Sequence, residues 1–154
     1  LVFFIDRYVQ DVHAAEDIAI DAFSELIVHK HRYNFKVTLK TYLYMVGRSR
    51  ALDYIKHRRV IRFVDLDAAQ DYADDSAALE KLVLADERKR QLHTALARLS
   101  EDMRAVLHLI YFEDMTYEQT AKVMTKNRKQ IDNLLYRANK ELRIILEKDG
   151  EHLL

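Results

Sequence analysis

The scarcity of helix-breaking residues restricts the fold of this chain more than any other feature of its sequence. Its 154 residues contain no proline and only two glycines, Gly47 and Gly150. The corners of β-rich folds need these two residue types, whereas long stretches without them favour helix. The sequence therefore predicts an all-α protein.

The chain also contains no cysteine, which excludes disulfides and thiolate zinc sites. His29 and His31 are one residue apart, but no third ligand stands at a helical spacing beside them, so we expect no metal. No apolar run reaches the roughly 18 residues of a membrane-spanning helix, and no signal-peptide pattern is present. We therefore expect a cytoplasmic protein without membrane insertion. Leu1 is not a methionine, and we expect the natural chain to begin before it.

The net charge of zero conceals two basic segments on either side of an acidic one. Residues 1–64 carry 11 Lys and Arg against 7 Asp and Glu, and residues 88–154 carry 13 against 10. Residues 65–87 carry 1 against 8. Such asymmetry points to a polyanionic partner. Together with the helical patterning, it predicts two small helical domains, residues 1–64 and 87–154, joined by an acidic linker over residues 65–86.

In the first domain, apolar residues recur at helical spacing between residues 15 and 27, which predicts a long amphipathic helix. The residues expected to face inward are Ala15, Ile18, Ala19, Ala22, Phe23, Leu26 and Ile27. A basic and aromatic loop follows over residues 29–38, and a second helix is expected from about Leu39 to Arg59. Residues 56–59 would place a patch of cations at the negative end of that helix.

In the second domain, a helix is expected through residues 92–99, and capping residues mark the expected starts of the three helices that follow it. Ser100 suits an N-cap, and Thr116 with Gln119 forms a capping box. Residues 125–127 make a short turn, at the end of which Asn127 opens a longer helix. Two helices joined by so tight a turn are the layout of a helix-turn-helix. The polar residues expected on its exposed face are Arg128, Lys129, Gln130, Asn133, Arg137 and Lys140.

Three stretches of the chain resemble conserved regions of bacterial sigma factors. Residues 15–23 (Ala-Glu-Asp-Ile, later Asp-Ala-Phe) are similar to the polymerase-docking helix of the second region, and residues 41–54 to its melting and minus-ten helix. Residues 96–142, with Tyr-Glu-Gln-Thr-Ala at 117–121, are similar to the fourth region. Both regions occur in the family's order with a short linker, which resembles the extracytoplasmic-function branch. The resemblance implies a transcription initiation factor whose partners are core RNA polymerase, promoter DNA and an anti-sigma factor.

The resemblance also assigns roles to individual residues. The six helix-turn-helix residues named above would read the minus-thirty-five element, with Arg137 and Lys140 on its phosphates. In the first domain, side chains suited to stacking on unpaired bases and to holding phosphates would open and bind the minus-ten element. These are Tyr33, Asn34, Phe35, Tyr42, Tyr44, Arg48, Ser49, Lys56, Arg58 and Arg59. Polymerase docking would use Asp17, Asp21 and Glu25 on the exposed face of the first long helix.

Two departures from the family pattern lie in the helix-turn-helix. Thr125 stands where the family usually has glycine, and Asp132 where it often has lysine. A carboxylate repels phosphate unless it accepts a hydrogen bond from a cytosine amino group. A stand-alone helix-turn-helix regulator is the alternative function, although it has no use for a strand-melting domain. The nucleophile–base pairs and glycine loops of enzymes are absent from the sequence, and we expect no cofactor.

Overall fold

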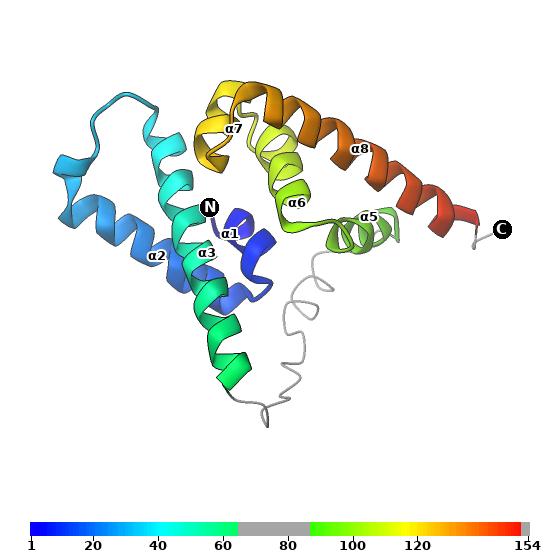
Figure 1. Cartoon of the computed structure of the whole chain (residues 1–154), viewed down its shortest axis with the longest axis horizontal. Helices are drawn as coiled ribbons and strands as arrows, with labels where there is room; N and C mark the ends of the chain where they lie inside the picture. Colours follow the sequence, from blue (N-terminus) through cyan, green and yellow to red (C-terminus); the bar gives the residue numbers. More distant parts are fainter. Residues whose placement is uncertain (65–86, 152–154) are drawn as a thin grey trace. The chain divides into compact units, whose positions relative to one another are not determined.

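The computed structural model describes residues 1–64 and 87–151 and divides the chain into two compact units, Leu1–Ala78 and Leu79–Leu154 (Figure 1). Helices account for most of the described residues, and no strand occurs among them, which confirms the predicted all-α class. The predicted acidic linker, residues 65–86, lies outside the described residues. Among the helices of these two stretches, none is long and apolar enough to cross a membrane.

The first unit contains three helices that contact one another: α1 (Val2–Val9), α2 (Val12–Val28) and α3 (Leu39–Val64). A short 3-10 turn, η1 (Lys30–Arg32), follows α2. The joint between α1 and α2 has two local causes. Gln10 ends α1 in the left-handed conformation with φ 53°, and the Asp11 side chain caps α2 by accepting a 3.2 Å hydrogen bond from the amide of Ala14.

The core of the first unit lies where the three helices meet. Gly47 of α3 permits a close approach there, because a Cβ at this position would stand 3.0 Å from Cδ1 of Leu1 and 3.3 Å from Cδ1 of Ile5. α1 and α3 therefore pack through a residue without a side chain. The buried apolar side chains of this core are Phe4, Ile5, Tyr8, Val9, Ala15, Ile18, Ala19, Ala22, Leu43, Tyr44 and Ala51.

Two details of the first unit differ from the sequence prediction. The apolar stripe of α2 is only partly buried, since Phe23 is 48% exposed and Ile27 is 74% exposed. α1 and α3 cover the face around Ala15 and Ala22 but leave the flank of the stripe in solvent. In addition, α3 continues to Val64, so the basic residues 56–59 do not form its C-terminal end.

The second unit contains α5 (Glu87–Ala97), α6 (Glu101–Leu107), a π-helical turn η2 (His108–Phe112), α7 (Tyr117–Met124) and α8 (Arg128–Glu151). α8 is the longest helix of this unit and contacts α5, α6 and α7, so all three pack against it around the core. The buried apolar residues of that core include Ala95, Leu99, Val106, Leu109, Met124, Ile131, Leu134, Leu135 and Ala138. The sequence did not predict the π-helical turn.

The predicted caps of the second unit are confirmed. The Ser100 hydroxyl accepts a hydrogen bond from the Met103 amide, and Thr116 and Gln119 form the reciprocal capping box. The turn of residues 125–127 separates α7 from α8 as expected. Thr125 ends α7 in the left-handed conformation, with φ 54° and ψ 46°. This conformation suits glycine, the residue that the family pattern usually has there.

Candidate nucleic-acid interfaces

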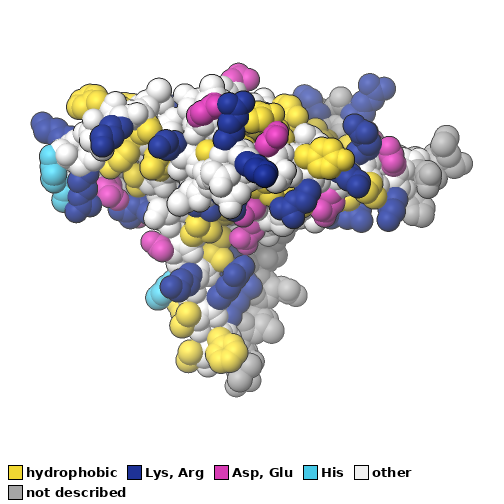
Figure 2. Space-filling model, turned by 45° about the horizontal axis from the view of Figure 1, so that its top comes forward, with side chains coloured by type: hydrophobic (Ala, Val, Ile, Leu, Met, Phe, Trp, Pro, Cys, Tyr) yellow, Lys and Arg dark blue, Asp and Glu magenta, His cyan; other side chains and the backbone are white. Residues whose placement is uncertain are grey.

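The N-terminal half of α8, residues 128–140, presents a polar and basic surface. All six residues predicted to line it are exposed, namely Arg128, Lys129, Gln130, Asn133, Arg137 and Lys140. Basic side chains are also spread over the helices on the face drawn in Figure 2, with scattered acidic ones between them. A helix that presents amide and cationic side chains in this way matches the hydrogen-bonding edges and phosphates of the DNA major groove.

Contacts at the start of α8 fix several of these side chains. Asn127 and Gln130 cap the helix reciprocally, because the Asn127 amide donates to Gln130 Oε1 (2.9 Å) and the Gln130 amide donates to Asn127 Oδ1 (2.8 Å). The side-chain oxygen of Gln130 thus already accepts a hydrogen bond, which leaves its side-chain NH₂ group to donate to a base. Arg128 Nη1 donates to Glu118 Oε1 of α7 (2.7 Å), and its guanidinium carbon lies 5.9 Å from the centre of the Tyr117 ring.

Two aromatic rings of the loop between η1 and α3 cluster with a third ring from the first turn of α3. The centre of the Tyr33 ring lies 4.7 Å from that of Phe35 and 5.1 Å from that of Tyr42. The Tyr33 hydroxyl donates to the carbonyl of Val37 (2.6 Å), which closes the loop. Phe35 has φ 61° and is 84% exposed. The left-handed conformation is uncommon for a bulky residue, and the exposed ring is accessible to a partner.

Tyr44 is a core residue, which corrects its predicted place among the side chains that contact bases. It is only 5% exposed, and its ring centre lies 5.0 Å from that of Phe4 in α1. Arg48 is half-buried and donates from Nε to the hydroxyl of Tyr8 (3.0 Å), so it also has an internal role. The remaining predicted residues of this surface lie on the loop or on α3: Asn34, Ser49, Lys56 and Arg59 are exposed, and Arg58 is half-buried.

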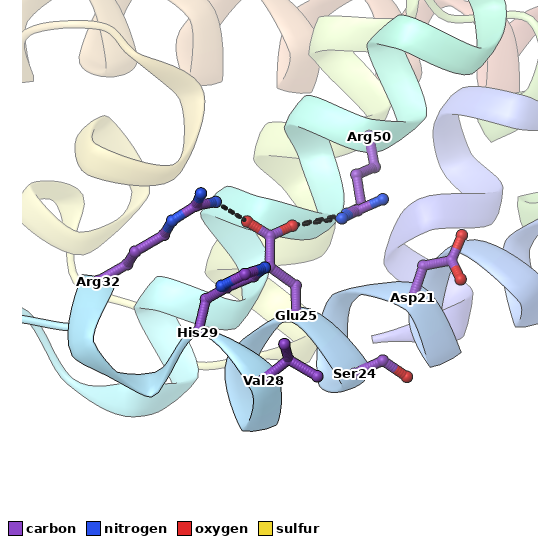
Figure 3. A pocket seen from close by; sticks show the side chains of 7 residues that line it. All are labelled: Asp21, Ser24, Glu25, Val28, His29, Arg32 and Arg50. Carbon is purple, nitrogen blue, oxygen red and sulfur yellow. Dashed lines mark hydrogen bonds and ion pairs between the residues drawn. The ribbon is translucent and has the colours of Figure 1, made fainter.

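The predicted docking face on α2 requires one correction as well. Asp17 and Asp21 are exposed as expected, but Glu25 is mostly covered. Its carboxylate accepts hydrogen bonds from Arg50 of α3 and from Arg32 of η1 (Figure 3). These residues line a hollow of about 360 Å³, together with Asp21, Ser24, Val28 and His29. The hydrogen bond from Arg50 lowers the pKa of Glu25, and the charges of both arginines act in the same direction.

Sequence reasoning missed the exposed apolar side chains on the flank of α2. Ile20, Phe23, Ile27 and Val28 are all exposed, beside the acidic residues. Exposed apolar side chains that gather into a patch are typical of surfaces where proteins associate. The width of the apolar pattern contained this signal, because the stripe from residue 15 to residue 27 is wider than one buried helix face needs. No group of three metal-binding side chains occurs within residues 1–64 and 87–151.

Comparisons with known proteins agree with this architecture. Residues 1–60 match the family model of Sigma-70 region 2, and residues 89–142 match that of Sigma-70, region 4. Together the two regions span most of the chain. A stand-alone helix-turn-helix regulator would explain only the match to region 4. The match of residues 1–60 to region 2 agrees with the resemblance noted for residues 15–54.

Relatives along the whole chain carry the same description. The chain is 25% identical to the ECF RNA polymerase sigma factor SigX of Bacillus subtilis (strain 168) over 156 residues, which covers 98% of this chain and 80% of that protein. It is 23% identical to ECF RNA polymerase sigma factor SigM of the same organism, covering 94% of this chain and 87% of that one.

The fold also has a solved counterpart. The sigma factor RpoE from Bartonella quintana, solved in complex with the anti-sigma factor NepR, superposes with a TM-score of 0.73. The match covers 95% of this chain and 89% of that one at 19% identity. The two regions, the relatives and the fold thus show that this chain belongs to the RNA polymerase sigma factors of the extracytoplasmic-function type, which direct promoter recognition and transcription initiation.

Proposed function

We propose that this sigma factor captures the minus-ten strand with the loop of residues 33–38 and acts by binding alone, without covalent chemistry. The exposed ring of Phe35 carries this proposal, since it is held at φ 61° by a loop that Tyr33 closes. An unpaired base that stacks on this ring exchanges contact with water for contact with an aromatic face. Exposed basic residues of α3 in the same unit, Lys56 and Arg59 among them, then hold the phosphates.

The helix-turn-helix supplies the second contact of this proposal, with the minus-thirty-five duplex. Asn133 and the NH₂ group of Gln130 are its base readers, and Arg137 and Lys140 hold phosphates. Domain boundaries follow from this division of labour. Residues 1–64 melt the promoter, residues 87–154 read the duplex, and residues 65–86 link them.

Docking on core RNA polymerase uses the exposed face of α2 in this proposal. Asp17 and Asp21 provide charge, and Ile20, Phe23 and Ile27 provide apolar area. Apolar side chains surrounded by charges are the usual composition of a protein interface. The RpoE structure contains an anti-sigma factor, which supports an anti-sigma partner for this chain as well. We assign the protein to the cytoplasm, where the polymerase acts.

Strand binding and run-off transcription, measured for a matched pair of variants, test the central claim. Phe35→Ala should reduce binding of the holoenzyme to a single-stranded minus-ten oligonucleotide by about 5- to 150-fold, which corresponds to about 1–3 kcal/mol of stacking. Phe63→Ala is the control, because Phe63 is equally exposed (85% against 84%) and lies on α3 outside the loop. Run-off transcription from a duplex promoter should fall with strand binding. Equal behaviour of the two variants would remove Phe35, and the loop with it, from strand capture.

Tyr44→Ala provides a contrast within the same unit. Because the Tyr44 ring belongs to the core, its removal should cost about 3–5 kcal/mol of unfolding free energy. Phe35→Ala should leave the thermal unfolding of the chain within about 0.5 kcal/mol of the wild type, as expected for an exposed side chain.

A further inference from the structure

We propose that Glu25 is a positioning residue that fixes the 33–38 loop in the orientation needed for strand capture. This inference rests on the proposed role of that loop. The carboxylate of Glu25 receives Arg32 of η1 on one oxygen (Nη1 to Oε1, 3.3 Å) and Arg50 of α3 on the other (Nε to Oε2, 3.0 Å). One side chain of α2 therefore joins the element that precedes the loop to the helix that follows it (Figure 3).

The loop itself is closed by short-range hydrogen bonds. The Tyr33 hydroxyl donates to the Val37 carbonyl, and the Lys36 amide donates to Asn34 Oδ1 (3.1 Å). These bonds hold the loop together as one piece, and its orientation depends on how its two ends are attached. At the far end, the Thr38 hydroxyl accepts from the amide of Thr41 (3.2 Å), which caps the start of α3 firmly.

The near end of the loop has a weaker attachment. η1 is a single 3-10 turn whose three residues, Lys30, His31 and Arg32, are all exposed. No side chain of the turn itself is buried, so the Tyr33 ring against Tyr42 of α3 is the nearest packed contact, and a side-chain contact within the turn would fix its direction further. The ion pair from Arg32 to Glu25 supplies such a contact one residue before Tyr33. Arg50 holds the carboxylate in place for this purpose, and its hydrogen bond, which lowers the pKa of Glu25, favours the ionised form that pairs with both arginines.

Two variants interrupt this bridge at different points. Glu25→Gln removes the charge from the centre, and Arg32→Gln removes only the arm to η1 while the Glu25–Arg50 pair remains. Glu87→Gln is the matched control, because Glu87 also pairs with an arginine, Arg90 (3.3 Å), but on α5 of the other unit. Thermal unfolding of each variant shows whether the chain is folded at the assay temperature.

The first measurement is the affinity of the reconstituted holoenzyme for the single-stranded minus-ten oligonucleotide. Glu25→Gln and Arg32→Gln should each lower this affinity by about 3- to 10-fold, which is less than the loss expected when the stacking ring itself is removed. Core-polymerase affinity and the Glu87→Gln control should not change. If Arg32 instead served only as a phosphate contact, Glu25→Gln would release it and strengthen strand binding, which would overturn the proposal.

The second measurement is a double-mutant cycle with Phe35→Ala. If Glu25 acts through the loop, Glu25→Gln should cause no further loss once the Phe35 ring is gone. Independent, multiplicative losses would mean that Glu25 supports the unit generally and would refute the positioning role. The cycle also separates the two proposals, since a normal Phe35→Ala variant contradicts the strand-capture role, whereas a defective Phe35→Ala with a normal Glu25→Gln contradicts the positioning role alone.

A third measurement observes the loop directly. The chain contains no tryptophan, so Phe35→Trp introduces a single indole in the loop, which can be excited selectively over the tyrosines. Adding Glu25→Gln to this variant should lower the fluorescence anisotropy, because the released loop moves more freely on the nanosecond scale. Glu87→Gln in the same background should leave it unchanged. An anisotropy that does not respond to Glu25→Gln would show that the carboxylate does not hold the loop, and would overturn the proposal.

Discussion

The guanidinium of Arg128 lies 2.7 Å from the carboxylate of Glu118, and this ion pair joins the first residue of α8 to the first turn of α7. Both side chains are mostly exposed. Such a pair contributes little to stability, at most about 1 kcal/mol. It does determine where the positive charge of Arg128 points at the entrance of the helix that faces DNA in our proposal.

Removal of this pair should change DNA binding more than folding. Glu118→Gln leaves the cation of Arg128 available to a phosphate, so affinity for duplex DNA should rise and the slope of log K against log salt should steepen by about 0.9. Titrations of the minus-thirty-five duplex with holoenzyme at several salt concentrations measure both quantities. A slope equal to that of the wild type would show that Arg128 does not reach a phosphate. Asp102→Asn, which removes the Lys126 pair of the same unit, is the control.

The apolar part of the docking face predicts a specific loss of polymerase affinity. Ile27→Ser should weaken binding to core RNA polymerase by about tenfold, because a central interface side chain contributes more than about 1 kcal/mol. Stability should change by less than about 0.5 kcal/mol, since Ile27 is already in solvent. Ile144→Ser, at an exposed position of α8, serves as the control. A fluorescence titration with labelled core enzyme tests this, and equal affinities for both variants would contradict the assignment of the α2 face.

Base readers and phosphate contacts on α8 should respond differently to substitution. Asn133→Ala should relax the preference at one or two base pairs by about 1–3 kcal/mol, whereas Lys140→Ala should weaken all sequences alike and reduce the salt slope by about one. Asp132→Lys should strengthen binding to every promoter, because it replaces a charge that repels phosphate. A panel of promoters with single base changes at two salt concentrations distinguishes these patterns. A loss with Asp132→Lys on cytosine-containing sites alone would identify Asp132 as a base reader instead.

The left-handed conformation of Thr125 predicts that a glycine would stabilise the second unit. A β-branched residue at φ 54° carries a cost of about 1–2 kcal/mol that glycine avoids, although glycine also loses more entropy on folding. Thr125→Gly should therefore raise the unfolding free energy by about 0.5–1 kcal/mol. Lys126→Gly, one residue further along the turn, should lower it. Chemical unfolding followed by circular dichroism compares the two, and a destabilised Thr125→Gly would show that its hydroxyl or methyl group makes a compensating contact.

The lowered pKa of Glu25 predicts a pH dependence of stability. The folded state favours the carboxylate, so this side chain contributes stability that is fully present above its unfolded value, about 4.5, and is lost as pH falls through the lower folded pKa. Between pH 6 and pH 3, the wild type should lose more unfolding free energy than Glu25→Gln does. Urea unfolding at a series of pH values gives the difference. Parallel curves would mean that the bond from Arg50 does not favour the ionised form.

Most local features of this protein could be predicted from its sequence. The helical class follows from the lack of proline, Ser100 was predicted as an N-cap, and Thr116 was predicted with its partner Gln119. These features join residues three or four positions apart, so their hydrogen bonds are decided before any helix packs against another. The two helices and the short turn of the helix-turn-helix follow from the same short-range patterns.

Only the tertiary structure decided which residues remain available to partners. Tyr44 and Phe35 look alike in the sequence, but α1 brings Phe4 onto the first ring and leaves the second in solvent. Likewise, Glu25 lies on the polar side of its helix, and Arg50, 25 residues away, takes it out of the docking face. Whether a helix face is covered depends on the position and length of other helices. The periodicity of apolar residues cannot specify this, because it tells on which face of a helix a residue lies but not which other helix covers that face.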